Sequence, residues 1–236
     1  MFADELVLVA RALVKTYITG EIETPALRGV DLSLGQGEFV SLVGPSGCGK
    51  TTLLNLIGGL DRPTMGQITL DGTRMDQASE KVLSKVRLNN IGFVFQAYNL
   101  FPVLTAAENV EYVLMLRDVP AAERRRKALE LLDAVGLADM ADRRPTRLSG
   151  GQQQRVAVAR AISTDPRLVL ADEPTANLDS ESAGQLLDMM EDLNSQRGVT
   201  FLFSTHDSRV VERAHRVVHL RDGLVINDGN GNHAKV

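Results

Sequence analysis

Most apolar positions of the chain fall into short runs of about five residues, separated by polar turns that contain glycine. In the first part of the chain such runs cover residues 6–10, 30–34 and 39–43. Turn residues stand at 19–20 and at 35–37. The pattern predicts an antiparallel meander that leads into a buried strand.

Later in the chain, apolar runs at residues 168–171, 200–204 and 217–220 alternate with stretches of helical spacing. Buried parallel strands joined by crossover helices have this pattern. The sequence therefore predicts an α/β core. A further strand is expected at 67–70, and the polar, glycine-containing tail 227–236 is expected to fray.

Helical spacing of leucine and isoleucine appears first at residues 50–59, where a pair of glycines ends it. Residues 97–163 then become helix-rich, most clearly at 121–135 and 152–163. We expect this segment to be a helical subdomain inserted into one domain of 236 residues. The α/β core and its β subdomain would then comprise residues 1–96 and 164–236.

Composition and charge narrow the class of protein. The chain has 44% hydrophobic and 24% charged residues, as an ordinary globular domain has. Its net charge is −4 and it has no long basic block, so no nucleic-acid partner is expected. Cys48 is the only cysteine, which excludes an intramolecular disulfide and a four-cysteine metal site.

No apolar run approaches the roughly 18–20 residues that cross a bilayer. The acidic start, residues 1–5, lacks the layout of a signal peptide. We therefore expect a chain that is neither exported nor membrane-spanning.

A glycine-rich segment between the apolar run 39–43 and the first helical pattern fits G-x-x-x-x-G-K-(S/T). Its glycines let successive backbone N–H groups point inward at a helix N-terminus, which makes a cradle for polyphosphate. Lys50 would reach the β- and γ-phosphates, and the Thr51 hydroxyl would be a ligand of Mg²⁺. The candidate nucleotide-binding residues here are Gly44, Pro45, Ser46, Gly47, Cys48, Gly49, Lys50, Thr51 and Thr52.

Two adjacent carboxylates, Asp172 and Glu173, follow the apolar run 168–171. The carboxyl edge of an α/β sheet is where ligand-binding groups are presented. Asp172 is placed to hold Mg²⁺, and Glu173 to polarise the attacking water as a general base.

A second possible anion site lies before the helical pattern 152–163, in the segment Ser149, Gly150, Gly151 and Gln152. A serine hydroxyl and flexible backbone amides stand there at a helix N-terminus, without a lysine. One complete phosphate loop and one incomplete anion site suggest that two copies of the chain complete each other.

These motifs resemble those of the nucleotide-binding subunits of ATP-binding cassette (ABC) transporters, and the resemblance runs from about residue 6 to residue 223. It implies a P-loop NTPase (RecA-like) core with an N-terminal antiparallel β subdomain and a helical subdomain. It also implies two ATP molecules held between two copies, each copy presenting Ser149 to Gln152 to the phosphate loop of the other.

Single residues carry the resemblance further. Gln96 resembles the glutamine that senses Mg²⁺ and water, and Asp179 resembles the loop that communicates across the dimer. His206 is similar to the histidine that contacts the γ-phosphate, and Tyr17 to the aromatic residue that stacks on adenine.

Longer stretches, including residues 53–64 and 91–102, resemble the branch that contains lipoprotein-release and macrolide-export ATPases. The resemblance implies a homodimer at the cytoplasmic face of the inner membrane, beneath transmembrane permease subunits. Tyr98, Leu100 and Phe101 would then form either the seat of a permease helix or part of the ordinary core.

Two alternatives share the same ATP chemistry. One is a soluble ABC-type ATPase of repair or cofactor assembly, and the other is a membrane signalling switch without transport. The first would have a soluble partner, whereas the second differs from a transporter only in whether a solute or lipid leaves the membrane.

Overall fold

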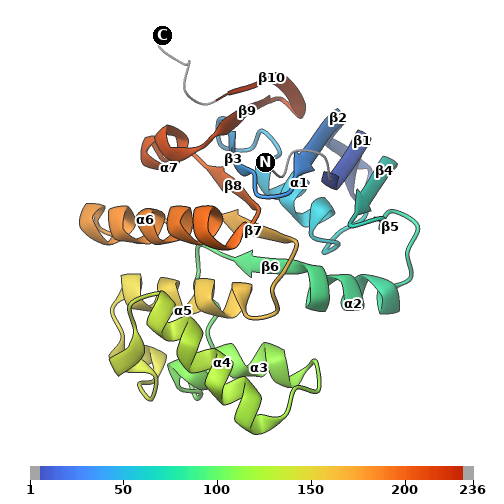
Figure 1. Ribbon diagram of the computed structural model, residues 1–236. Helices are drawn as coiled ribbons and strands as arrows, with labels where there is room; N and C mark the ends of the chain where they lie inside the picture. Colours follow the sequence, from blue (N-terminus) through green and yellow to red (C-terminus); the bar gives the residue numbers. More distant parts are fainter. Residues whose placement is uncertain (1–5, 231–236) are drawn as a thin grey trace.

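The computed structural model describes residues 6–230, which form two β-sheets with helices around them (Figure 1). The smaller sheet is antiparallel, with strand order β2-β1-β4-β5. The larger sheet has the order β10-β9-β3-β8-β7-β6 and is parallel except for β10, which runs antiparallel to β9. The strands are Leu6–Thr19 (β1), Ile22–Gly35 (β2), Phe39–Val43 (β3), Met65–Leu70 (β4), Thr73–Arg74 (β5), Ile91–Val94 (β6), Leu168–Asp172 (β7), Phe201–Thr205 (β8), Arg216–Arg221 (β9) and Leu224–Asn230 (β10).

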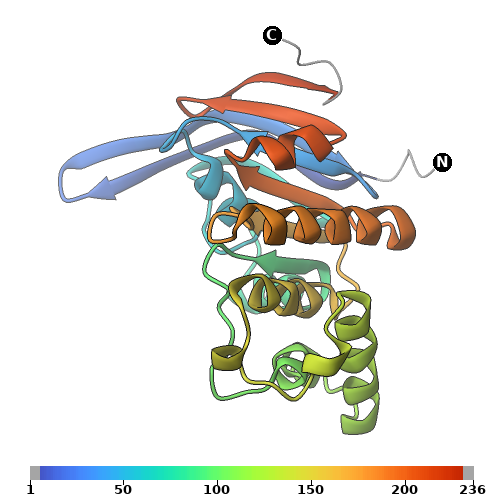
Figure 2. The same cartoon turned by 90° about the vertical axis from the view of Figure 1, so that its left-hand side faces the viewer.

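Helices cover the larger sheet and fill the middle of the chain (Figures 1 and 2). The helix α5 packs against β6 and against α3, α4 and α6. Two short 3₁₀ turns, Ala138–Met140 and Pro145–Arg147, precede it. The α-helices are Lys50–Ile57 (α1), Glu80–Asn90 (α2), Ala106–Met115 (α3), Ala121–Ala134 (α4), Gly150–Ile162 (α5), Ser180–Arg197 (α6) and Ser208–Arg213 (α7).

Alternating residues of the central strands feed two separate hydrophobic clusters. Phe39 and Phe203 belong to the cluster that the sheet shares with α3 to α7. Leu42 and Leu202 belong to the cluster that lies against α1 and the antiparallel sheet. Because both faces are covered, β3 and β8 are buried along their whole length and are mostly apolar, as is typical of parallel strands. The parallel strands β3, β8 and β7 also end at the same edge of the sheet.

The mixed α/β fold predicted from the sequence is confirmed. The strands predicted at 39–43, 168–171, 200–204 and 217–220 agree with β3, β7, β8 and β9 to within a few residues. The helix predicted at 50–59 agrees with α1 in the same way. Figure 2 shows the β1–β2 hairpin, which is longer than its apolar runs suggested, projecting beyond the helices.

The prediction that the tail frays is wrong for residues 227–230. They belong to β10, where Asn227 pairs with His219 and Asp228 with Val218. An antiparallel ladder at a sheet edge needs backbone hydrogen bonds and only one covered face, so a polar sequence suffices. Residues 231–236, the rest of that predicted tail, lie outside the described residues.

Candidate functional site

The phosphate loop connects the end of β3 to the start of α1 and is wedged between other strands. A Cβ on Gly44 would stand 2.1 Å from the carbonyl oxygen of Leu220, and one on Gly49 would stand 2.6 Å from that of Ala26. Gly49 also has a φ of 108°, where only glycine is unstrained. The loop conformation thus depends on glycine at both positions.

Replacing Gly49 by alanine should therefore disrupt the loop. We expect Gly49→Ala to weaken ATP binding at least about tenfold. A tenfold change corresponds to about 1.4 kcal/mol, which is lost readily when the backbone N–H groups of the loop no longer point at the phosphates. Gly47→Ala is the matched control: its φ of 78° carries the same kind of backbone penalty, but no atom lies within 4 Å of the added Cβ. Calorimetric titration checks both variants, and equal affinities would contradict the argument from close packing.

Lys50 begins α1 and lies almost buried, with 9% of its surface exposed. Its Nζ donates to the carbonyl oxygens of Gly44, at 2.7 Å, and Pro45, at 3.2 Å. The loop's own carbonyls thus hold the ammonium group against it. Together they border a cavity of about 620 Å³.

Two of the three residues expected to hold magnesium, Thr51 and Asp172, meet at the border of this cavity. Thr51 Oγ1 lies 3.2 Å from Asp172 Oδ2 and 3.5 Å from Oδ1, although the residues are 121 positions apart. Hydroxyl and carboxylate oxygens are the hard ligands that Mg²⁺ prefers, and the ion usually takes only one or two of them from the protein. The pair therefore fits a Mg²⁺ ion whose other ligands are phosphate and water.

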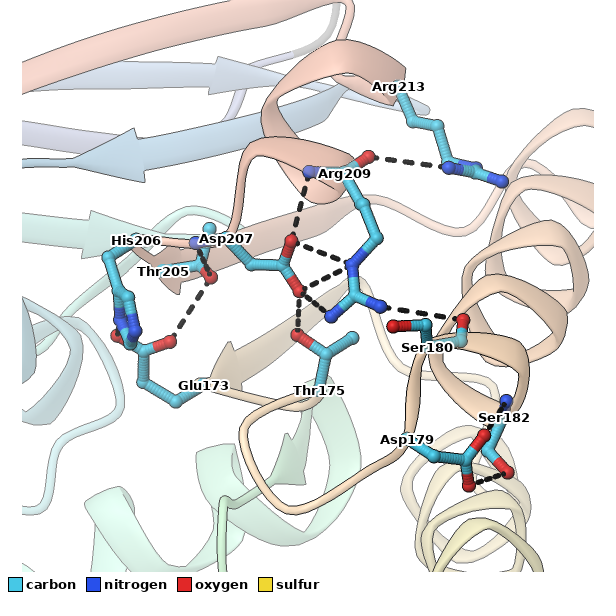
Figure 3. Close-up of polar contacts among 10 residues, drawn as sticks. All are labelled: Glu173, Thr175, Asp179, Ser180, Ser182, Thr205, His206, Asp207, Arg209 and Arg213. Atoms are coloured by element: carbon cyan, nitrogen blue, oxygen red, sulfur yellow. Dashed lines mark hydrogen bonds and ion pairs between the residues drawn. The ribbon is translucent and has the colours of Figure 1, made fainter.

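Glu173 stands in a strained backbone conformation directly after β7. Its φ is 47°, and its backbone N–H donates to the Ser204 carbonyl oxygen at 2.8 Å. Such strain is often found at functional sites. Figure 3 shows the Glu173 side chain beside His206 and Thr205: Oε1 lies 2.7 Å from His206 Nδ1, and Oε2 accepts from Thr205 Oγ1 at 3.1 Å. The two side chains expected to handle water and γ-phosphate are thus in direct contact.

Most of the residues predicted to bind nucleotide or metal lie on this one cavity. They are Gly44, Pro45, Ser46, Gly47, Gly49, Lys50, Thr51, Thr52, Gln96, Asp172, Glu173 and His206. Cys48 does not line it, because its side chain is buried in the cluster against the antiparallel sheet. Only its backbone can therefore contribute to the cradle.

Three predicted features lie away from the cavity. Ser149 caps α5 by accepting from the Gln152 backbone N–H, and the Gln152 side chain accepts from the Ser149 backbone N–H. Asp179 caps α6 through Ser182, whose hydrogen bonds lower the pKa of Asp179. Neither these residues nor Gly150, Gly151 and Tyr17 line the cavity of their own chain.

Tyr17 is held in place at the antiparallel sheet. Its hydroxyl donates to Asp61 Oδ2 at 3.0 Å, and the Lys15 ammonium stands 4.8 Å from the centre of its ring. Lys15 also donates to Asp61 Oδ1 at 2.7 Å. The aromatic ring is therefore fixed in orientation, and 39% of the residue is exposed.

The sequence analysis missed three residues that line the cavity, Ala26, Ala176 and Ser204. Ala26 could not have been found from motifs, because β2 belongs to the other sheet. Ser204 is 1% exposed, and its hydroxyl has no hydrogen-bond partner among the described residues. Its place at the end of the apolar run before His206 was the available signal.

A P-loop, a threonine and an aspartate suited to Mg²⁺, and a carboxylate at the same sheet edge are the parts that P-loop NTPases share. The family model described as ABC transporter matches residues 27–176. The chain belongs to the ABC transporter family. It is an ATP-binding and ATP-hydrolysing subunit of that family, as its motifs predict.

Relatives support the narrower resemblance as well. The lipoprotein-releasing system ATP-binding protein LolD of Anaeromyxobacter dehalogenans is 49% identical over 216 residues, covering 91% of this chain and 90% of that protein. The macrolide export ATP-binding/permease protein MacB of Brucella melitensis is 45% identical over 214 residues, covering 91% of this chain and 33% of that longer protein. The predicted branch is thereby confirmed.

Among solved structures, a dimeric post-hydrolysis state of the ATP-binding cassette MJ0796, bound to ADP and Pi, has a TM-score of 0.87 with this chain. That protein comes from Methanocaldococcus jannaschii. The two chains are 42% identical, and the match covers 94% of this chain and 98% of the other. The predicted P-loop fold is confirmed by this similarity.

The helices between residues 6 and 230 include none that combines the length and the apolar character of a membrane span.

Proposed function

We propose that the chain works as a homodimer with two Mg²⁺-ATP molecules between its copies and drives a separate membrane permease. The observation that carries the proposal is the cavity that gathers Lys50, Thr51, Asp172, Glu173 and His206. The start of α5, with the Ser149 hydroxyl and the two glycines that follow it, lies outside that cavity on the same chain and suits the cavity of a second copy.

Each residue of the cavity has a role that suits phosphoryl transfer. Lys50 binds the β- and γ-phosphates, and Thr51, Asp172 and Gln96 hold the metal ion, which neutralises charge on the phosphates. Glu173 orients or deprotonates the attacking water, and His206 fixes the γ-phosphate. Ser149 and the glycines beside it contact the γ-phosphate of the second copy's nucleotide, and Asp179 contacts that copy.

A groove of about 410 Å³ is the proposed binding site for the permease. Phe101, Tyr112 and Leu116 line it together with Phe93 and Phe95 from the segment before Gln96. Of the three residues expected to form either the permease seat or part of the core, only Phe101 lines this groove. Phe101 is 41% exposed at the groove, whereas Leu100 packs against the core and the Tyr98 hydroxyl lies beside Gly150.

Binding at this groove would keep the chain at the cytoplasmic face of the membrane. Relatives named for lipoprotein release and for macrolide export support export or lipoprotein release as the work done. The permease, rather than this chain, would contact the substrate.

Trapping the ATP-bound form in membranes tests the proposal. Tagged Glu173→Gln protein is incubated with Mg²⁺-ATP in cell membranes, extracted gently with detergent and purified with whatever it binds. We expect a permease with few transmembrane helices and a large extracytoplasmic domain. A purely soluble partner, or a chain that stays in the cytosol alone, would overturn the transporter role and leave the ATPase activity intact.

Tyr17 is proposed to stack on adenine with the ring face opposite Lys15. We expect Tyr17→Ala to weaken ATP binding about tenfold, since base–aromatic stacking contributes about 1–3 kcal/mol. Tyr17→Phe removes only the hydrogen bond to Asp61, so it should keep most of the affinity. Titration with ATP and with inorganic triphosphate separates the contributions, and an equal loss for both ligands would contradict a role at adenine.

A further inference from the structure

A single carboxylate, that of Asp207, joins the loop after β8 to the loop after β7. Asp207 follows His206 directly, and its Oδ2 accepts from Thr175 Oγ1 at 2.7 Å. Thr175 is 2% exposed and lies two residues after Glu173. The Asp207 backbone N–H also donates to Thr205 Oγ1, the hydroxyl that reaches Glu173. Figure 3 shows these contacts as one continuous set.

The Arg209 guanidinium group binds this carboxylate in a bidentate manner. Its Nε donates to Asp207 Oδ1 at 2.9 Å, and its Nη2 donates to Oδ2 at 2.7 Å. The Arg209 backbone N–H donates to Oδ1 as well, at 3.0 Å. Hydrogen bonds from Arg209 are the main reason that the pKa of Asp207 falls to about 2. Asp207 is thus ionised at every pH at which an ATPase works, and both of its oxygens are engaged.

The same guanidinium group also reaches the far end of the connection between β7 and α6. Arg209 Nη1 donates to the carbonyl oxygen of Ser180 at 3.4 Å. Ser180 opens α6 and follows Asp179, the cap of that helix. One side chain therefore connects the loop that carries His206 with the helix start that carries Asp179 (Figure 3).

We propose that Arg209 is a positioning residue that couples His206 to Asp179, so that γ-phosphate contact in one site sets the loop facing the other copy. The inference rests on the proposed function, because it needs Asp179 to face a second copy. A planar guanidinium that fixes both carboxylate oxygens leaves that side chain little freedom to rotate. Any displacement of His206 therefore moves Asp207, Arg209 and Ser180 together, and Thr175 carries the same displacement towards Glu173.

The matched control is Arg213, one turn further along the same stretch. Its Nη2 donates to Asp188 Oδ1 on α6 at 2.6 Å and its Nη1 donates to the Arg209 carbonyl oxygen at 3.4 Å, whereas none of its hydrogen bonds within residues 6–230 reaches Asp207. Arg213→Ala thus removes an equal charge and another link to α6, while the hydrogen bonds between the Arg209 and Asp207 side chains remain.

The test is the ATP dependence of hydrolysis by Arg209→Ala, Arg209→Lys and Arg213→Ala, with circular dichroism melts of each variant. We expect Arg209→Ala to lower kcat about ten- to a hundredfold, as small misplacements of reacting groups do, with KM changed less than about threefold. The Hill coefficient should fall to about 1, because the two sites no longer influence each other. Arg209→Lys should recover only part of kcat, and Arg213→Ala should behave as the unaltered protein does.

Thr175→Val supplies a second test should Arg209→Ala fail to fold. It keeps the shape of the side chain and removes only the hydrogen bond to Asp207. Like Arg209→Ala, it should lower kcat. Unchanged kcat and Hill coefficient in both Arg209→Ala and Thr175→Val, beside a cooperative unaltered protein, would overturn the inference alone. A non-cooperative unaltered protein that forms no ATP-dependent dimer would overturn the proposed function and the inference with it.

Discussion

Glu173→Gln should bind Mg²⁺-ATP, form a stable dimer and hydrolyse ATP at least about a hundredfold more slowly than the unaltered protein, as the loss of a general base predicts. The amide keeps the size of the side chain and can still meet Thr205 and His206. It cannot accept a proton from water. Phosphate release under steady-state conditions measures the rate, and size-exclusion chromatography with ATP measures the dimer.

The control for this variant is Glu130→Gln, which removes a carboxylate from the exposed surface of α4, where Glu130 pairs with Arg126. It should hydrolyse ATP normally. Near-normal turnover by Glu173→Gln would remove Glu173 from the role of base. Slow turnover without ATP-dependent dimers would instead place the defect in nucleotide binding.

Lys50→Ala should abolish measurable ATP binding, with affinity falling at least about a hundredfold, since hydrogen bonds to a charged group contribute about 1.5–3 kcal/mol each. The ammonium group is almost buried and already oriented by two carbonyl oxygens, so little freedom is lost when phosphate arrives. Calorimetric titration measures the affinity directly.

Lys85→Ala provides the comparison, because Lys85 is an exposed lysine on α2. It removes the same charge and should bind ATP unchanged. An affinity of Lys50→Ala equal to that of Lys85→Ala would refute the phosphate cradle.

Much of the cavity could be predicted because most of its residues belong to two local sequence patterns, each of which has a physical cause. Gly44 to Thr51 must curl around phosphate after a strand and before a helix, and Asp172 and Glu173 must follow a buried strand. Parallel pairing of β3, β8 and β7 then brings their ends together. Thr51 and Asp172 consequently meet, although 121 positions separate them.

The elements that the sequence analysis did not predict either depend on tertiary contacts or have a local signal other than apolar spacing. The helix α2 buries only Leu83 and Val86, which is too weak an apolar pattern to be noticed. The helix α3 does have a local signal, the capping box of Thr105 and Glu108, which its apolar pattern alone did not reveal. The strand β10 is polar, and it forms because β9 offers it a backbone partner.

The network around Asp207 was also beyond sequence reasoning. Thr175 and Ser180 lie in the connection from β7 to α6 and Asp207 lies after β8, and nothing in their spacing predicts that Asp207 meets Thr175 or that Arg209 reaches both Asp207 and Ser180. Asp207 appeared in the sequence only as the residue after His206. Only the folded structure shows that Arg209 lies between the loop after β8 and the start of α6 and donates hydrogen bonds to both.

The central claim is that each ATP site is built from two copies of the chain, and mixing two inactive variants tests it most directly. Lys50→Ala and Ser149→Arg should each be inactive alone, Ser149 being exposed so that arginine fits the free chain. Mixed in equal amounts they should recover about a quarter of the unaltered rate, because half of the dimers are mixed and each has one intact site. Full activity of Ser149→Arg alone, or no recovery on mixing, would contradict the shared site.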